Sequence, residues 1–187
     1  MASYFKIPRP IRKAVGAVAE KLPHKHGINY LIRGSKDLDE RFIGNAYIFS
    51  EKERKDILSI KTSAPDAMAI TKPFYDKVRD QDQVTQMQYI DLHLWMTGDI
   101  LLKADKMSMA HSLELRVPFL DRKVMELAEQ IPVKDRVTET ETKYAMRLAA
   151  LQACPPQTAK KKKLGFPVPI RVWLKEDKYY LSLIHIS

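Results

Sequence analysis

A carboxylate and a guanidinium alternate with aliphatic residues near the middle of the chain. The stretch 113–117 reads LELRV, and this period of two is typical of an extended segment. Pro118 disfavours helical backbone at the residue before it. The alternation places Glu114 and Arg116 on one face, where they could line an active site or form an internal ion pair that fixes a bend.

A second group with chemical potential is the run of four lysines at 160–163, which continues as LGFPVP. Lysine beside a glycine turn suits phosphate, because the ammonium is a compact cation and Gly165 lets the backbone approach closely. Taken alone, such a run is more often a solvated surface loop. His93 and His111 fit packing roles on apolar helices, Cys154 fits an incidental thiol, and we predict no metal site.

Length and composition indicate a globular chain with a sizeable core. It has 187 residues, 45% hydrophobic and 29% charged. No apolar run approaches the roughly 18 to 20 residues that cross a bilayer, and a single cysteine favours the cytoplasm. The net charge of +9 favours anionic partners. The glycine-rich patterns GxGxxG and GxxxxGK(S/T) are absent from the sequence.

Hydrophobic periodicity predicts a mainly α chain with one short extended segment and no doubly wound sheet of its own. The segment 24–34 is expected to be a connection with two histidines. Helices are expected over 4–23, 37–49, 51–60, 63–78, 83–97, 99–110, 121–131, 138–151 and from 172 onward.

Three helix starts have specific signals. Ser50 with Glu53 and Thr138 with Glu141 have the spacing of capping boxes, and Asp121 is a suitable N-cap. The helix over 83–97 is apolar almost all round, so we expect it to be buried, and we expect Gly98 to interrupt it.

The run DILLKADKMSMAHSLELRVPFLDRKV resembles the signature of the synthetase domain in glutamine-hydrolysing asparagine synthetases. The resemblance spans at least residues 89–174. It implies the helical C-terminal portion of an α/β adenine-nucleotide α-hydrolase-like domain, of the PP-loop ATP pyrophosphatase type. Residues 1–180 would form this partial synthetase domain, and residues 181–187 a non-native or truncated tail.

The same resemblance implies the chemistry of the parent protein. Such enzymes use ATP and magnesium to adenylate aspartate, and ammonia derived from glutamine then gives asparagine. By resemblance, Lys163 contacts the β- and γ-phosphates of ATP beside Gly165, and Glu114 organises the site with Arg116 as its ion-pair partner.

Further positions match the family pattern with less defined roles. Lys103 and Asp105 would anchor the helix before the extended segment. Lys143 and Arg147, four residues apart, also match a family pattern, but we interpret them as a surface stripe.

The sequence also departs from the family. It contains neither the SGGxDSS pyrophosphate loop nor the acidic SGEGxDE segment, and Ala2 stands where the glutaminase has its cysteine. We therefore expect the 187-residue chain to need the missing N-terminal portion of the same protein as a partner. Alone it should be catalytically inactive and prone to self-association through exposed apolar faces.

Two other functions remain open. The chain could be a stand-alone basic helical module for nucleic acid or another polyanion. Against this, its basic residues are spread among 23 acidic ones, with few aromatics beside the lysines. Alternatively, the parent ligase could adenylate a carboxylate other than aspartate, because the residues that recognise the carboxylate lie largely outside this stretch.

Overall fold

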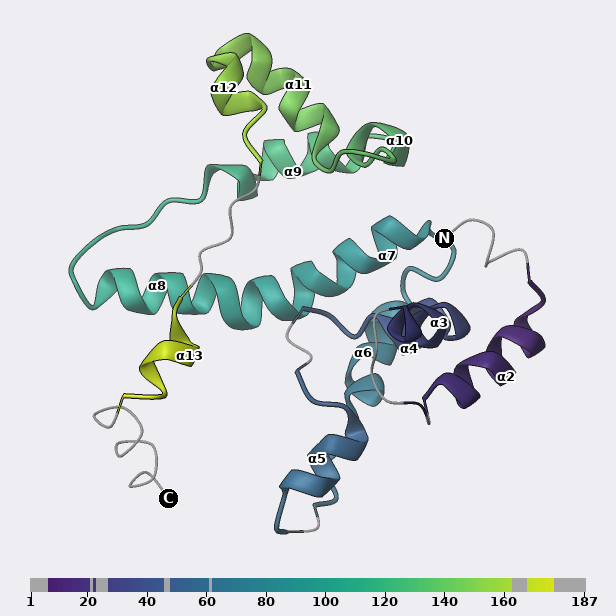
Figure 1. The fold of residues 1–187 in the computed structure, drawn as a ribbon. Helices are drawn as coiled ribbons and strands as arrows, with labels where there is room; N and C mark the ends of the chain where they lie inside the picture. The colour runs from purple at the N-terminus through teal and green to yellow at the C-terminus, as the bar shows by residue number, and fades with distance from the viewer. Residues whose placement is uncertain are drawn as a thin grey trace. The chain divides into compact units, whose positions relative to one another are not determined.

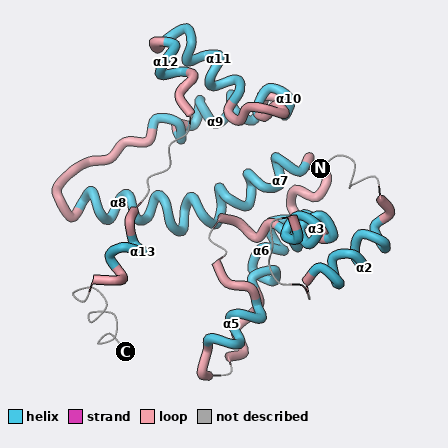
Figure 2. Tube along the Cα trace, viewed as in Figure 1, coloured by secondary structure: helices cyan, strands magenta, loops and turns pink. Residues whose placement is uncertain are grey.

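The computed structural model describes residues 7–20, 22, 27–45, 48–60, 62–162 and 168–176. Within these ranges the chain is helical, with no strand beyond one isolated antiparallel bridge between Val137 and Thr142. Figure 2 shows helices joined by loops. The predicted mainly α class is confirmed. Internal contacts divide the chain into an N-terminal unit, Met1–Val133, and a C-terminal unit, Lys134–Ser187.

The N-terminal unit begins with two packed helices, α2 (Arg9–Ala19) and α3 (Ile28–Ser35) (Figure 1). Pro10 lies in the first turn of α2, where its missing N–H costs no hydrogen bond. Small residues make the buried face of α2, Gly16 and Ala19, while its larger apolar side chains, such as Val18, are exposed. Because the buried residues of α2 are small, its backbone packs closely against α3.

The expected connection over 24–34 is wrong in its second half, because α3 begins at Ile28. Gly27 stands before the helix with φ of 97°, a conformation that glycine adopts without strain. Apolar residues at 28, 31 and 32 follow helical spacing, and this pattern favours a helix after the polar start of the segment. His24 and His26 lie outside the described residues.

The expected helix over 37–49 is also wrong in most of its length. Only α4 (Leu38–Arg41) forms, and Asp37 with Glu40 completes its capping box. Helical backbone ends at Phe42, which is already extended with φ of −127° and ψ of 97°, and Gly44 follows with φ of 104°, a conformation that favours glycine. At this turn the Tyr75 hydroxyl donates a hydrogen bond to the Phe42 carbonyl, and the Asn45 side-chain amide donates one to the Asp91 carboxylate.

The next helix begins as predicted, whereas the one expected from residue 63 begins later, at Ala67. The side chain of Ser50 accepts a hydrogen bond from the Glu53 amide, and the Glu53 carboxylate bonds the Ser50 amide, so the capping box opens α5 (Glu51–Ile57). Asp66 caps α6 (Ala67–Tyr75) through the Ala69 amide. Tyr75 and Thr71 from α6 are buried.

A continuous helical rod follows, made of α7 (Gln83–Ile90), a π-helical segment η1 (Asp91–Leu101) and α8 (Leu102–Met109). Gly98 does not interrupt it, so that expectation is wrong. Glycine at this position keeps helical backbone within the wider π segment. The rod is also less buried than expected, since Ile90 is fully buried while Leu102 and Met107 are exposed.

The rod leads into an extended segment, a 3₁₀ turn η2 (Pro118–Leu120) and α9 (Arg122–Glu129). The predicted N-cap Asp121 is confirmed, because its carboxylate accepts a hydrogen bond from the Lys123 amide.

The C-terminal unit contains α10 (Val133–Arg136), α11 (Tyr144–Ala153), α12 (Pro156–Ala159) and α13 (Ile170–Trp173). The capping box expected at Thr138 is wrong. Its hydroxyl does accept from the Glu141 amide, but the two residues belong to a turn whose ends pair through the bridge from Val137 to Thr142. Helix α11 starts later, after Lys143 in left-handed conformation with φ of 60°.

Candidate functional site

The predicted pair at the centre of the chain forms. A guanidinium nitrogen of Arg116 lies 2.7 Å from a carboxylate oxygen of Glu114, and the two side chains are 81% and 72% exposed. The alternation therefore placed them correctly on one face, but the pair is exposed to water and not internal. Such a pair contributes little to folding stability. Because both side chains are exposed, both charged groups are accessible to a ligand.

The opposite side of this segment is apolar and also exposed. Ser112 has φ of 55°, and the Leu113 amide bonds the Ser108 carbonyl at the end of α8. The exposed apolar side chains are Leu113, Leu115, Val117 and Phe119. An apolar face of this kind supports the expectation of self-association, which stays a prediction.

The supporting positions on the preceding helix have separate neighbours. The ammonium of Lys103 lies 2.9 Å from a carboxylate oxygen of Asp99, and the other Asp99 oxygen accepts a hydrogen bond from the Trp95 indole. Asp105 is exposed. Lys103 thus ties α8 to the π-helical segment, and the structure does not pair it with Asp105.

Lys163 and Gly165 lie outside the described residues. The three lysines before them, 160–162, are described and exposed. The guanidinium of Arg147 donates hydrogen bonds to the carbonyls of Ala159 and Lys161 at 3.0 and 3.2 Å. Sequence reasoning treated Arg147 as a surface residue, but its side chain fastens the backbone of the lysine run.

A cavity of about 990 Å³ lies in the N-terminal unit, among α2, α3, α5 and the start of α6. None of the predicted site residues lines it. Two of its lysines pair with lining carboxylates, since Lys36 contacts Glu20 at 2.8 Å and Lys13 contacts Glu40 at 3.6 Å. Asp66, another lining carboxylate, caps α6.

Two groups with raised pKa values, Tyr75 and Asp91, form hydrogen bonds that stabilise the fold of the N-terminal unit. Burial raises the pKa of Tyr75 to about 12. Burial likewise raises the pKa of Asp91, partly offset by the hydrogen bond from the Asn45 amide. Neither group lies among the predicted site residues.

Among the described residues, no group of three His, Cys, Asp or Glu side chains could hold a metal ion. The part of the chain that the structure describes has no helix long and apolar enough to cross a membrane. The exposed ammonium groups at 160–162 suit anionic groups in general.

Comparison with known proteins places these features in a family. Residues 12–184 match the family model for asparagine synthase. The chain is 44% identical over 175 residues to the glutamine-hydrolyzing asparagine synthetase 1 of Bacillus subtilis (strain 168), covering 93% of this chain and 28% of that protein. It is also 44% identical over 170 residues to a putative glutamine-hydrolyzing asparagine synthetase of Mycobacterium bovis, covering 90% of this chain and 26% of that protein.

The chain thus spans about a quarter of the length of these curated relatives. A shorter match of 33% identity over 82 residues, covering 44% of this chain and 13% of the relative, is to asparagine synthetase 3 of Bacillus subtilis. No solved structure matches significantly. The family model covers most of the chain, and the helices fit a helical portion of a PP-loop synthetase domain. The chain belongs to the asparagine synthase family.

Proposed function

We propose that this chain supplies the helical C-terminal portion of a synthetase domain that makes asparagine from aspartate, ATP and glutamine-derived ammonia. The observation that carries the proposal is the 44% identity over 93% of the chain to a glutamine-hydrolyzing asparagine synthetase. On this proposal residues 1–180 form one part of the domain, residues 181–187 lie outside it, and the protein works in the cytoplasm.

The proposed reaction places a phosphate role on the lysine run. The carboxylate of aspartate attacks the α-phosphorus of ATP, pyrophosphate leaves, and ammonia then attacks the aspartyl-adenylate and releases AMP. Negative charge develops on the departing pyrophosphate. An ammonium positioned there, for which we propose Lys163 beside Gly165, stabilises this charge and contributes about two to three powers of ten in rate.

Glu114 and Arg116 are proposed to organise the site. Their 2.7 Å contact joins a carboxylate and a guanidinium on an otherwise irregular segment. A carboxylate can orient an amine or a positively charged neighbour, because it accepts charge-assisted hydrogen bonds. Lys103 and Asp105 would keep α8, and with it the start of this segment, in position.

The polypeptide 1–187 by itself is expected to be catalytically inactive. Its sequence contains no glycine- and serine-rich phosphate loop, so backbone amides that cradle phosphates are not supplied by this stretch. We expect no pyrophosphate release from ATP and aspartate with ammonia present. Turnover above background by the purified chain would contradict this part of the proposal.

A chimaera tests the function directly. Residues 12–184 would replace the matching segment of the Bacillus subtilis asparagine synthetase 1, and asparagine and AMP formation would be measured with glutamine or with ammonia. Glutamine-dependent synthesis supports the proposal. A folded chimaera that releases AMP with another carboxylate but not with aspartate would indicate a ligase of different substrate.

Binding of polyanions is the competing function, and the net charge of +9 favours it. Titration of the 187-residue chain with single-stranded DNA at several salt concentrations separates the two. We expect weak binding, whereas tight binding with a steep salt dependence would support the nucleic-acid function.

A further inference from the structure

The side chain of Arg147 joins two parts of the C-terminal unit that are distant in sequence. Its Nε donates a hydrogen bond to the Thr142 carbonyl at 3.2 Å. Its Nη1 donates to the carbonyls of Ala159 and Lys161 at 3.0 and 3.2 Å. One guanidinium therefore holds the approach to α11 and the end of α12 together. The two helices lie next to one another (Figure 1).

These contacts hold the backbone carbonyls of Ala159 and Lys161, while the lysine side chains at 160–162 stay exposed to water. Ala159 is buried, at 7% exposure, and its carbonyl and that of Lys161 are the two acceptors on either side of Lys160. The amide of Lys160 bonds the Pro156 carbonyl at 3.0 Å as α12 ends. Lys160, Lys161 and Lys162 are nevertheless exposed. The start of the lysine run thus has an anchored main chain and accessible ammonium groups.

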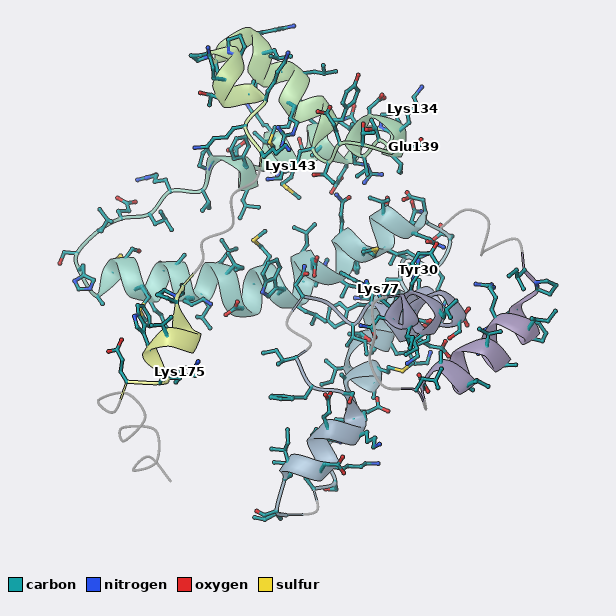
Figure 3. All side chains as sticks on the ribbon, in the orientation of Figure 1. Tyr30, Lys77, Lys134, Glu139, Lys143 and Lys175 are labelled. Carbon is teal, nitrogen blue, oxygen red and sulfur yellow. The ribbon has the colours of Figure 1, made fainter. Side chains whose placement is uncertain are left out.

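The ammonium groups of the run are not neutralised by neighbours. Lys160, Lys161 and Lys162 form no ion pair with any carboxylate in the described ranges, nor does Lys143, labelled in Figure 3. In the N-terminal unit, by contrast, several lysines are paired, namely Lys13, Lys36, Lys72 and Lys103. Cations gathered on a fixed backbone without carboxylate partners are suited to an anionic ligand.

We propose that Arg147 is a positioning residue, which anchors the backbone at Ala159 and Lys161 so that the ammonium groups at 160–162 meet the phosphate oxygens of a nucleotide. The inference rests on the proposed function, which assigns the phosphates to this run. Arginine suits the task because its planar guanidinium presents several donors at once in fixed directions, while a lysine ammonium is a single point of attachment.

The anchoring is tested on the full 187-residue chain with a lysine-specific protease. Initial cleavage rates after Lys160, Lys161 and Lys162 would be measured by mass spectrometry. Arg147→Gln should raise these rates about tenfold, the factor expected when charge-assisted hydrogen bonds no longer hold the segment. Cleavage after Lys55 and Lys106 should not change. An equal rise at all sites would mean general destabilisation and would overturn the proposal.

Arg147→Lys keeps the charge and serves as the conservative variant. The Arg147→Lys chain should be cleaved after the run nearly as fast as the Arg147→Gln chain. The three donors of an ammonium group share one nitrogen, so they cannot reproduce the separate Nε and Nη1 donors that reach the Thr142, Ala159 and Lys161 carbonyls. Full recovery of the slow wild-type rate by lysine would show that charge alone suffices, against the proposal. Circular dichroism of both variants checks that the helices are retained.

The phosphate role is tested with inorganic triphosphate as the probe. Triphosphate should slow cleavage of the run in the wild type, and Arg147→Gln should need about tenfold more of it for the same protection. Arg122→Gln is the matched control, since it removes one exposed guanidinium from the N-terminal unit. Equal weakening by Arg122→Gln would indicate net charge only and overturn the proposal.

The two readouts separate the possible failures. Faster cleavage of the Arg147→Gln chain with unchanged triphosphate affinity would support the backbone anchoring by Arg147. It would refute the proposal that this anchoring positions the lysines for phosphate. If the chimaera makes no asparagine while both readouts respond as expected, the proposed function fails and the positioning of an anion-binding run by Arg147 holds.

Discussion

The hydroxyl of Tyr75 donates a hydrogen bond to the carbonyl of Phe42 at 2.6 Å. The tyrosine is 1% exposed, and it reaches from α6 to the residue at which α4 ends. This bond satisfies a carbonyl that the short helix leaves unpaired, and it thereby stabilises the turn that replaces the longer helix expected from sequence.

Removal of this hydroxyl should destabilise the N-terminal unit. Tyr75→Phe leaves the Phe42 carbonyl without its donor, and we expect a loss of about 1–3 kcal/mol in the free energy of unfolding. Urea denaturation followed by circular dichroism measures it. Tyr144→Phe is the control, since the structure gives its hydroxyl no hydrogen bond within the described residues, and equal loss in both variants would contradict the assignment.

The raised pKa of Tyr75 predicts a stability change at high pH. Burial raises the pKa from 10.0 to about 12 in the folded state, so the folded chain retains this proton when the unfolded chain loses it. The stabilisation is complete below pH 10 and is lost as the pH rises toward 12. The difference in unfolding free energy between wild type and Tyr75→Phe should narrow over this range, and a constant difference would refute it.

Two glycine substitutions should have opposite effects. A Cβ added at Gly16 would lie 2.0 Å from Oγ of Ser35, while one at Gly98 meets nothing within 4 Å. Gly16→Ala should cost about 1–3 kcal/mol through forced separation of α2 from α3. Gly98→Ala should gain about 0.5–1 kcal/mol, because alanine loses less backbone freedom on folding.

A double variant gives the control for Gly16. Ser35→Gly removes the side chain that the new methyl group would meet, so Gly16→Ala combined with Ser35→Gly should recover most of the loss relative to Ser35→Gly alone. Thermal melts of the four chains complete the cycle. Additive losses would show that the two helices do not touch at this point.

The capping box at Ser50 predicts a local effect. Ser50→Ala removes the acceptor of the Glu53 amide, and we expect about 1 kcal/mol of lost stability with faster amide exchange confined to α5. Ser59→Ala, outside any helix, is the comparison. Unchanged exchange in α5 would mean that the box contributes nothing in solution.

Lys163→Ala tests the proposed chemistry within the chimaera. The substitution removes the cation proposed to stabilise pyrophosphate, so kcat should fall about a hundredfold to a thousandfold, with KM for aspartate nearly unchanged. Lys55→Ala serves as the control. A loss confined to KM for ATP would indicate ground-state binding rather than stabilisation of the leaving group.

Local signals in the sequence were reliable where they involve neighbours a few residues apart. The Ser50 box, the Asp121 cap and the contact between Glu114 and Arg116 all formed as predicted, because short-range geometry decides them. Predictions of helix length were less successful. The segments around residues 44 and 98 both contain a glycine, yet Gly44 lies in a turn after a helix that has already ended, whereas Gly98 lies within a continuous helix.

By itself, the sequence determined the helical class, the family resemblance and the pairing of charges on the central segment, since periodicity, caps and a long mixed motif are local properties of the chain. Only the tertiary structure decided that Tyr75 ends the short helix α4, that Gly16 allows α2 and α3 to approach closely, and that Arg147 anchors the lysine run. Each of these contacts joins residues at least 12 positions apart, and their formation depends on how the helices pack rather than on any pattern within one segment.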